Sequence, residues 1–205
     1  MSDRAAPPPV PFVGLTGAVA SGKSAALEAF ARLGAATLST DAVVHELLAD
    51  GELAGMIAER WGEDAAPGGT VDRARVGAIV FERPEELRWL AGVLHPQVGA
   101  RVAAWRAGLD PSTPLAVVEV PLLFETGMDA AFDATVCVVA DDAIRARRAG
   151  ERGVELLAAR ESNQLSQSEK AERATHVVAN EGTPEELEAR LAELIPSLTG
   201  ARVDA

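Results

Sequence analysis

Short apolar runs alternate along the chain with longer segments in which apolar residues recur every three or four positions. The apolar runs cover residues 12–16, 36–39, 115–120, 135–140 and 176–179. Val117-Val118 and Val136 to Val139 lack alternating polar residues, which is typical of strands buried on both faces. Because such strands alternate with helical patterns, we expect an α/β fold in which helices cover both faces of a mainly parallel, five-stranded sheet.

A long helical insert is expected between the second and third strands, over about residues 42–108. Its apolar positions repeat at helical spacing, which indicates packed helices rather than a linker. These positions are Leu87, Leu90, Ala91, Leu94, Val98, Val102 and Trp105. We interpret the insert as the acceptor side of a single domain over residues 11–205, which follows a flexible tail over residues 1–10.

Two further helical segments are expected after the fourth strand. Residues 141–174 are rich in Arg and Glu and poor in large apolar residues. This composition fits either a lid that closes over phosphate groups or a solvated helical surface. The last helix has clear start signals, with Thr183 as N-cap, Pro184 at the first helical position and Glu186 as capping-box partner.

The composition excludes several classes of partner. The formal net charge is −12 and 48% of the 205 residues are hydrophobic, so we expect a compact domain with no broad basic surface for nucleic acid or an anionic membrane. No apolar run approaches the roughly 20 residues of a membrane span, and residues 1–11 lack an apolar signal segment, which favours a cytoplasmic protein. The one cysteine, Cys137, lies in an apolar run and is expected to be a buried small hydrophobe rather than a ligand or disulfide partner.

The run Gly17-Ala18-Val19-Ala20-Ser21-Gly22-Lys23-Ser24 fits G-x-x-x-x-G-K-[ST], a loop that wraps nucleotide phosphates. It lies between an apolar strand and a helical pattern over Lys23–Leu33, a context that a plain Gly/Ser turn does not need. The Lys23 ammonium is expected to neutralise phosphate charge, and the Ser24 hydroxyl to bind Mg²⁺. The expected ATP-binding residues are Gly17, Ala18, Val19, Ala20, Ser21, Gly22, Lys23, Ser24 and Ala25. The fold expected around them is the three-layer fold of P-loop NTPases.

A P-loop identifies a nucleotide and not a reaction. A guanine-specific switch would normally carry an Asn-Lys-x-Asp segment, but neither Asn163 nor Asn180 precedes a lysine. A kinase for a nucleotide or another small alcohol, and a regulatory protein that senses nucleotide, both stay open on these residues.

Several clusters resemble the dephospho-CoA kinase family, over about residues 12–195. They are Ser39-Thr40-Asp41, Leu94-His95-Pro96 and Val120-Pro121-Leu122-Leu123-Phe124-Glu125, supported by Gly69 to Arg73 and Ile79 to Phe81. The resemblance implies transfer of the γ-phosphoryl group of ATP to the 3′-hydroxyl of dephospho-CoA, the last step of coenzyme A synthesis. The family usually has an aspartate where this chain has Ser39, so one acidic group of its pattern is missing.

The resemblance also implies roles for individual residues on the acceptor side. Asp41 would orient or deprotonate the acceptor hydroxyl, although its type and position also suit an N-cap for a helix over Ala42–Ala49. His95 would reach the acceptor, or it is a helix-end residue set by Pro96. Glu119 and Glu125 would lie near the metal or the acceptor, and a surface loop is an equal alternative for Glu125.

On the donor side, the resemblance points to basic and amide side chains near the end of the chain. Arg148 and Arg152 lie four apart, on one face of a helix, and match lid positions that embrace the transferred phosphate. Separately, they are also compatible with surface charges. Asn180 resembles a residue near the adenine site, and its alternative is a turn former before Gly182.

Overall fold

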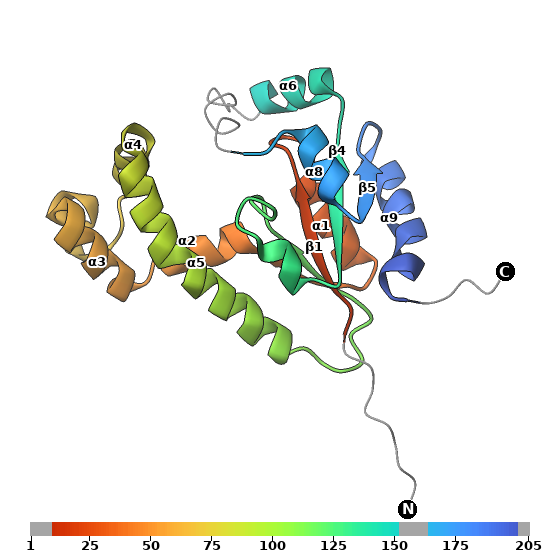
Figure 1. Cartoon of the computed structure of the whole chain (residues 1–205), viewed down its shortest axis with the longest axis horizontal. Coiled ribbons are helices and arrows are strands. Elements are labelled where there is room, and N and C mark those ends of the chain that lie inside the picture. The colour runs from red at the N-terminus through yellow and green to blue at the C-terminus, as the bar shows by residue number, and fades with distance from the viewer. Residues whose placement is uncertain (1–9, 152–163, 201–205) are drawn as a thin grey trace, which may run out of the picture. The chain divides into compact units, whose positions relative to one another are not determined.

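A parallel sheet of five strands forms the centre of the fold. The computed structural model of the chain describes residues 10–151 and 164–200. Within these residues the strands are β1 (Phe12–Gly17), β2 (Ala36–Ser39), β3 (Ala116–Glu119), β4 (Ala134–Val139) and β5 (His176–Ala179), in the order β2-β3-β1-β4-β5 (Figure 1). All neighbouring pairs are parallel. The predicted α/β class and parallel sheet are therefore confirmed, with strand ends close to the expected ones.

The strand order places β1 in the middle of the sheet, between β3 and β4. The carboxyl end of β1 therefore lies between the carboxyl ends of β3 and β4. In sheets of this kind, ligands bind at the carboxyl ends of the strands. In the register, Leu15 pairs with Glu119 on one side and with Val136 on the other. Glu119 in turn pairs with Ser39 at the end of β2, so the ends of three strands meet at one edge.

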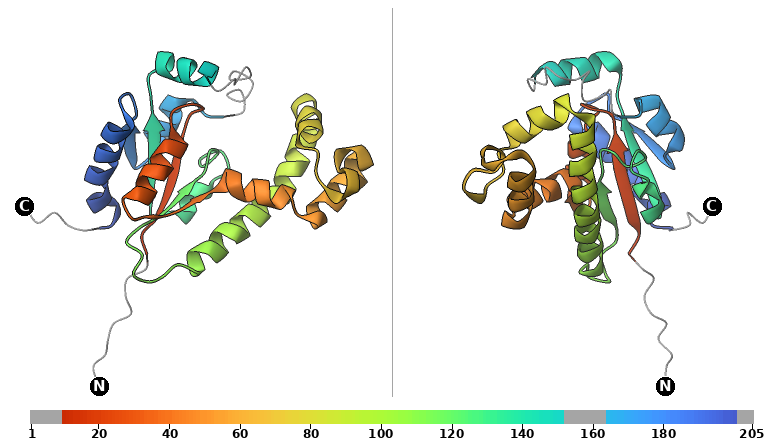
Figure 2. Two further views of the ribbon diagram at one scale, coloured as in Figure 1. Left: turned by 180° about the vertical axis from the view of Figure 1, so that it is seen from behind. Right: turned by 60° about the vertical axis from the view of Figure 1, so that its left-hand side comes forward.

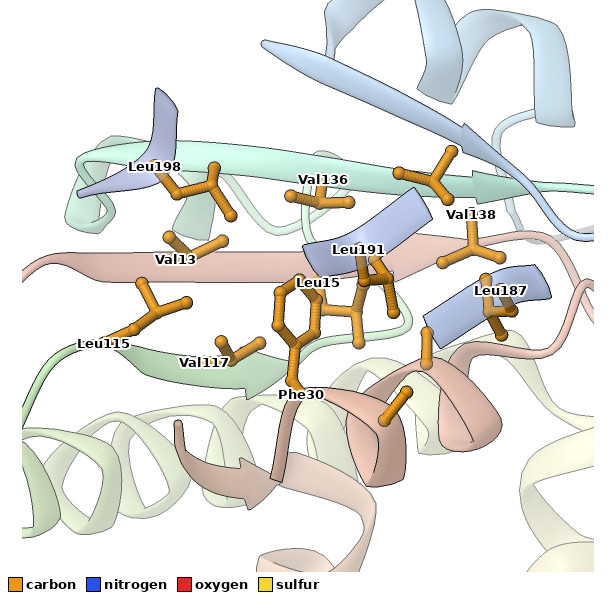
Figure 3. Close-up of a cluster of buried hydrophobic side chains, with 13 residues drawn as sticks. Val13, Leu15, Phe30, Leu115, Val117, Val136, Val138, Leu187, Leu191 and Leu198 are labelled. Atoms are coloured by element: carbon orange, nitrogen blue, oxygen red, sulfur yellow. The ribbon is translucent and has the colours of Figure 1, made fainter. Parts of the chain in front are cut away.

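The main core lies between the sheet and two helices, α1 (Lys23–Arg32) and α9 (Pro184–Leu198) (Figure 3). The side chains that fill it alternate along the strands with side chains on the opposite face, as the pleat requires. It contains Val13, Leu15, Ala26, Ala29, Phe30, Leu115, Val117, Val136, Val138, Val178, Leu187, Leu191 and Leu198. Complete burial of Phe30 and Leu191 ties both helices to the central strands.

The other face of the sheet packs against an aromatic side chain and a short helix. The ring of Phe132 stacks on Phe12 with centroids 4.7 Å apart, and α8 (Gln167–Arg173) packs against β4 and β1. The left view of Figure 2 shows the sheet and its helices from behind, opposite to the view of Figure 1. A short 3₁₀ turn, η3 (Met128–Ala131), precedes β4, and the helix α6 (Asp142–Glu151) follows it. Helices therefore lie on both faces, as the sequence predicts.

The chain divides into two compact units, one formed by the sheet with its helices and the other by Thr40–Ala107. The second unit contains α2 (Thr40–Leu48), α3 (Gly51–Trp61), η1 (Glu63–Ala65), η2 (Pro67–Gly69), α4 (Arg73–Glu82) and α5 (Pro84–Ala107). Leu90, Leu94, Val98 and Val102 of α5 are buried at four-residue spacing, in agreement with the predicted packing. Leu87, which the pattern also assigns to this face, is 38% exposed.

Two helix boundaries differ from the alternatives that the sequence left open. The helix α5 continues through Pro96 to Ala107, so the reading of His95 as a helix-end residue is wrong. Pro96 has no N–H for the carbonyl oxygen of Gly92, and the next residue, Gln97, donates from its side chain to the carbonyl oxygen of Val93 over 3.2 Å. The helix α2 begins at Thr40 and not at Ala42, so Asp41 lies inside its first turn and is not its cap.

The capping box of the last helix and the burial of Cys137 are two further local predictions that are confirmed. The Thr183 side chain accepts from the Glu186 N–H, and a Glu186 carboxylate oxygen accepts from the Thr183 N–H, which completes the capping box at the start of α9. Cys137 is buried and carries a free thiol. Among the helices of residues 10–151 and 164–200, none is long and apolar enough to cross a membrane.

Candidate active site

The predicted phosphate-binding loop joins β1 directly to α1. The last residue of β1 is Gly17, and α1 begins at Lys23. Gly22 occupies the N-cap position with a left-handed backbone and supplies no capping side chain. The N-cap residue therefore supplies no side-chain acceptor to the N–H groups at the start of α1, and with the helix dipole these groups favour an anionic ligand.

Both glycines of the motif stand where a side chain cannot fit. A Cβ atom on Gly22 would collide with the side-chain amide nitrogen of Asn180, and one on Gly17 would collide with the carbonyl oxygen of Val138. Between them, Ala20 has a φ of 61°, a left-handed conformation that residues other than glycine rarely adopt. A non-glycine residue held there indicates local backbone strain, which proteins retain most often at ligand sites.

Lys23 and Ser24 open the helix with the two side chains that the motif predicts. The ammonium group of Lys23 donates to the carbonyl oxygens of Gly17 and Ala18, over 3.1 and 2.9 Å. The hydroxyl group of Ser24 donates to Oε1 of Glu119 over 3.5 Å. Glu119 is 5% exposed and ends β3, next to β1, so the tertiary structure brings a buried carboxylate to the P-loop hydroxyl.

Two arginines of α6 donate hydrogen bonds to carbonyl oxygens of the same loop. Arg148, a predicted lid residue, donates to the carbonyl oxygens of Ser21 and Asn180 over 3.5 and 3.1 Å. Arg145 donates from Nε to the carbonyl oxygen of Val19 over 3.1 Å and pairs with Asp142 over 2.8 Å. Sequence reasoning missed Arg145, although its three-residue spacing from Arg148 places both on one helical face. Arg152, the second predicted lid arginine, lies outside the described residues.

Asn180 follows β5 and packs against the phosphate-binding loop. It is 5% exposed, and its Nδ2 donates to the carbonyl oxygen of Ser21 over 2.8 Å. Its backbone and side-chain oxygens both accept from the Arg148 guanidinium. A simple turn former would not need these contacts, so the residue has a defined place beside the nucleotide loop.

Glu125 is not a surface glutamate, and that alternative is wrong. Its side chain is only 15% exposed, and Oε1 pairs with the Lys170 ammonium over 3.0 Å and accepts from the Leu165 N–H over 2.9 Å. Its Oε2 is buried and accepts no hydrogen bond from the described residues. The partner Lys170, which sequence reasoning missed, is fully buried.

The two remaining predicted residues belong to the helical unit. Asp41 is exposed and lies two residues after Ser39, the end of β2. His95 is exposed on α5. The carboxylate of Asp41 near the start of α2 is also favourable for the helix dipole, so its position alone does not distinguish a chemical from a structural role.

The described residues contain no cluster of three or more His, Cys, Asp and Glu side chains that could hold a metal. Mg²⁺ does not require one, because it commonly uses one or two protein oxygens together with substrate phosphates and water. The oxygens of Ser24 and Glu119 fit that preference in chemical type. Taken with the open start of α1, the residues define a P-loop nucleotide-binding protein whose basic side chains converge on the phosphate loop.

Comparison with known proteins gives the particular family. The profile of the family described as "Dephospho-CoA kinase" matches residues 11–186. A dephospho-CoA kinase of Leifsonia xyli subsp. xyli is 40% identical over 198 residues, which cover 92% of this chain and 99% of the relative. The chain therefore belongs to the dephospho-CoA kinase family and is a kinase, which confirms the family and enzyme class that the sequence motifs predict.

Solved structures share the fold of this chain. A Thermus thermophilus protein superposes with a TM-score of 0.74 at 33% identity, over 94% of this chain and all of that one. A dephospho-CoA kinase from Campylobacter jejuni gives a TM-score of 0.69 over 92% of this chain and 97% of the other, and at 23% identity it supports the fold alone.

Proposed function

We propose that the chain transfers the γ-phosphoryl group of ATP to the 3′-hydroxyl of dephospho-CoA, with the residue roles given below. One observation supports the assignment of the ATP and Mg²⁺ site: the Ser24 hydroxyl lies 3.5 Å from the buried Glu119 carboxylate. Ser24 belongs to the first turn of α1, a helix whose N-cap residue supplies no capping side chain. Family membership supports the acceptor. Mg²⁺, dephospho-CoA as a small-molecule partner and a cytoplasmic location belong to the same proposal.

The phosphate loop and Lys23 would hold the triphosphate. The N–H groups around Gly22 to Ala25 are the donors proposed for its oxygens, aided by the positive end of α1. The Lys23 ammonium donates to two loop carbonyl oxygens in this structure. Bound phosphate would offer it stronger, charged acceptors, so we expect Lys23 to exchange those contacts for β- and γ-phosphate oxygens.

Ser24 and Glu119 are the proposed ligands of Mg²⁺. When bound, Mg²⁺ supplies charge neutralisation for the phosphate oxygens. Burial of Glu119 limits competition from water, and the Ser24 hydroxyl already approaches its carboxylate. The two side chains would therefore be oriented before the nucleotide arrives, which reduces the free-energy cost of assembling the site.

Asp41 is the proposed group that orients or deprotonates the acceptor hydroxyl. It follows the end of β2, and Ser39 there is the register partner of Glu119. His95 and Glu125 are proposed to contribute to acceptor binding. A carboxylate that accepts the proton as the new P–O bond forms would account for general-base assistance, while the loop and Lys23 stabilise charge on the transferred group.

Arg148 and Arg152 are the proposed lid arginines, and Asn180 is the proposed neighbour of the adenine. Arg148 is linked to both the phosphate loop and Asn180 in this structure. Nucleotide binding near the Ser21–Gly22 segment would therefore change the surroundings of the Arg148 guanidinium and of the Asn180 side chain together. A guanidinium released toward phosphate would gain charged acceptors in place of carbonyl oxygens.

The proposal is tested by incubating the purified chain with ATP, Mg²⁺ and a panel of acceptors, with products identified by mass spectrometry. The panel contains dephospho-CoA, nucleoside monophosphates and shikimate. We expect phosphoryl transfer to dephospho-CoA and a product that carries the new phosphate on the 3′-oxygen. Transfer to another acceptor with none to dephospho-CoA would overturn the proposal.

A further inference from the structure

Lys170 has an unusual environment for a lysine. It lies on α8 with an exposed fraction of 0%. Its ammonium group donates to the carbonyl oxygen of Pro121 over 2.6 Å and to Oε1 of Gln164 over 3.4 Å, and it pairs with Oε1 of Glu125 over 3.0 Å. Three acceptors match the three N–H donors of an ammonium group, so the charge is buried without an unsatisfied proton.

These contacts join segments that are far apart in the chain. The carbonyl oxygen of Pro121 also accepts from the hydroxyl of Thr16 over 3.4 Å. Thr16 directly precedes the first glycine of the phosphate loop, and Pro121 comes two residues after Glu119. Lys170 therefore shares its main acceptor with the strand that leads into the phosphate loop, at the turn that follows the Glu119 carboxylate.

A second side chain of α8 strengthens the same connection. The Gln167 amide donates to the carbonyl oxygen of Ala140 over 2.9 Å and accepts from the Ala140 N–H over 3.0 Å. Ala140 directly follows β4 and precedes α6, which carries Arg145 and Arg148. The short helix α8 thus fixes the turns after both neighbours of β1.

The residue type at position 170 also carries information. Of the 19 lysines and arginines in the chain, only Lys23 and Lys170 are lysines. A compact ammonium can direct three donors to three separate oxygens, whereas a guanidinium is planar, larger and arranged to bind two parallel acceptors. A fully enclosed position with three dispersed acceptors is therefore selective for lysine.

We propose that Lys170 is a positioning residue for phosphoryl transfer, which acts by fixing the Pro121 turn and thereby the Glu119 carboxylate opposite Ser24. The inference rests on the proposed function, because it assigns Glu119 to the metal. Lys170 itself contacts no substrate. Two of its three acceptors have different roles: Glu125 balances its charge, and Pro121 receives the hydrogen bond that orders the turn.

This division gives a test that separates positioning from stability. Lys170→Met removes the ammonium and leaves the Glu125 carboxylate buried without its cation, so the melting temperature falls. The double variant Lys170→Met with Glu125→Gln removes both charges, so the melting temperature recovers. Both variants lack the hydrogen bond to Pro121, and we expect kcat at saturating dephospho-CoA to fall roughly ten- to hundredfold in each, whereas loss of an acceptor contact by Glu125→Gln would raise KM. The Mg²⁺ concentration for half-maximal activity should rise in both.

Leu191→Ala is the matched control, because it destabilises the core without touching the Pro121 turn. At a temperature where all proteins are folded, its kcat and Mg²⁺ requirement should equal those of the wild type. Recovery of both quantities in the double variant would overturn the inference and leave a purely structural ion pair. If the single variant does not fold, the double variant decides alone. Wild-type protein that transfers no phosphoryl group to dephospho-CoA would instead refute the proposed function.

Discussion

The side-chain amide of Asn180 donates from Nδ2 to the carbonyl oxygen of Ser21 over 2.8 Å, which joins the end of β5 to the phosphate loop. The same nitrogen occupies the space in which Gly22 would carry a side chain. Asn180 and Gly22 are thus complementary in shape, and the conformation of the loop depends on a residue in the last strand–helix connection.

Replacement of Gly22 by alanine tests this relationship, and Gly34→Ala is its control. Both glycines have positive φ, 100° and 91°, but no atom lies within 4 Å of a Cβ at Gly34. Each variant should lose about 1–2 kcal/mol of unfolding free energy for the left-handed backbone. Gly22→Ala should lose more because of the Asn180 collision, and its ATP affinity should fall by roughly tenfold or more. Equal stability and normal ATP binding in both variants, measured by denaturation and calorimetry, would contradict the packing.

Lys23→Ala should lower kcat by roughly a hundred- to thousandfold, the scale of losing one preorganised charged donor at a transferred group. The melting temperature should change little, since the ammonium donates to loop carbonyl oxygens and does not belong to the hydrophobic core. Arg32→Ala is the control on the same helix, because it removes an exposed ion pair with Glu188 and should leave kcat unchanged. Turnover above about a tenth of the wild type in Lys23→Ala would remove this lysine from the mechanism.

Asp41→Asn keeps the size and polarity of the side chain while it removes the proton acceptor. We expect kcat with dephospho-CoA to fall roughly a hundredfold or more, the usual scale for a general base. ATP affinity should persist because the phosphate loop is intact. The control is Asp50→Asn, which changes another exposed acid of the same helical unit, the N-cap of α3, to a residue that also caps helices well. Near-normal kcat in Asp41→Asn would leave Asp41 only its favourable position in the first turn of α2.

Glu119→Gln should raise the Mg²⁺ concentration for half-maximal activity roughly tenfold or more, as expected when a carboxylate of a metal site is lost. Its similar size and the surrounding strand should preserve the fold. Titration of activity with Mg²⁺ at saturating ATP measures the effect, and Glu188→Gln on the exposed side of α9 serves as control. An unchanged Mg²⁺ requirement would assign Glu119 to a different role.

The thiol of Cys137 should react slowly with thiol reagents at about pH 8 until the chain is unfolded. Burial raises the pKa of Cys137 from 9.0 to about 11, against a smaller lowering by the charges of Lys170 and Lys23. Below about pH 9 the thiol is protonated in both states and does not affect the pH dependence of stability. Between about pH 9 and 11 only the unfolded chain loses the proton, so stability should fall as the pH rises. Cys137→Ala should remove this part of the alkaline slope, and fast native-state labelling would refute the assigned burial.

Local patterns were sufficient for the strands, for the first and last helices, and for the main chemical feature of the site. The five strands, the phosphate loop between β1 and α1, and the capping box of Thr183 and Glu186 follow from periodicity and turn chemistry within short segments. Such signals depend on neighbours a few residues apart, so they can be read directly from the sequence. The local sequence also allowed a helix end at Pro96. In the structure α5 continues past this proline, because the tertiary packing of its buried face stabilises the helix on both sides of it.

The partners of the polar site residues depended on the tertiary structure. The Asn180–Ser21 hydrogen bond spans 159 residues, the Arg145–Val19 bond 126 and the Ser24–Glu119 contact 95. No local period specifies such pairs, because they arise only when the order and register of the strands bring distant turns to one edge of the sheet. The burial of Lys170 against Glu125 and Pro121 is of the same kind. The sequence alone therefore determined which segments bind phosphate and which family motifs are present, while packing of the parallel sheet decided which side chains hold those segments in place.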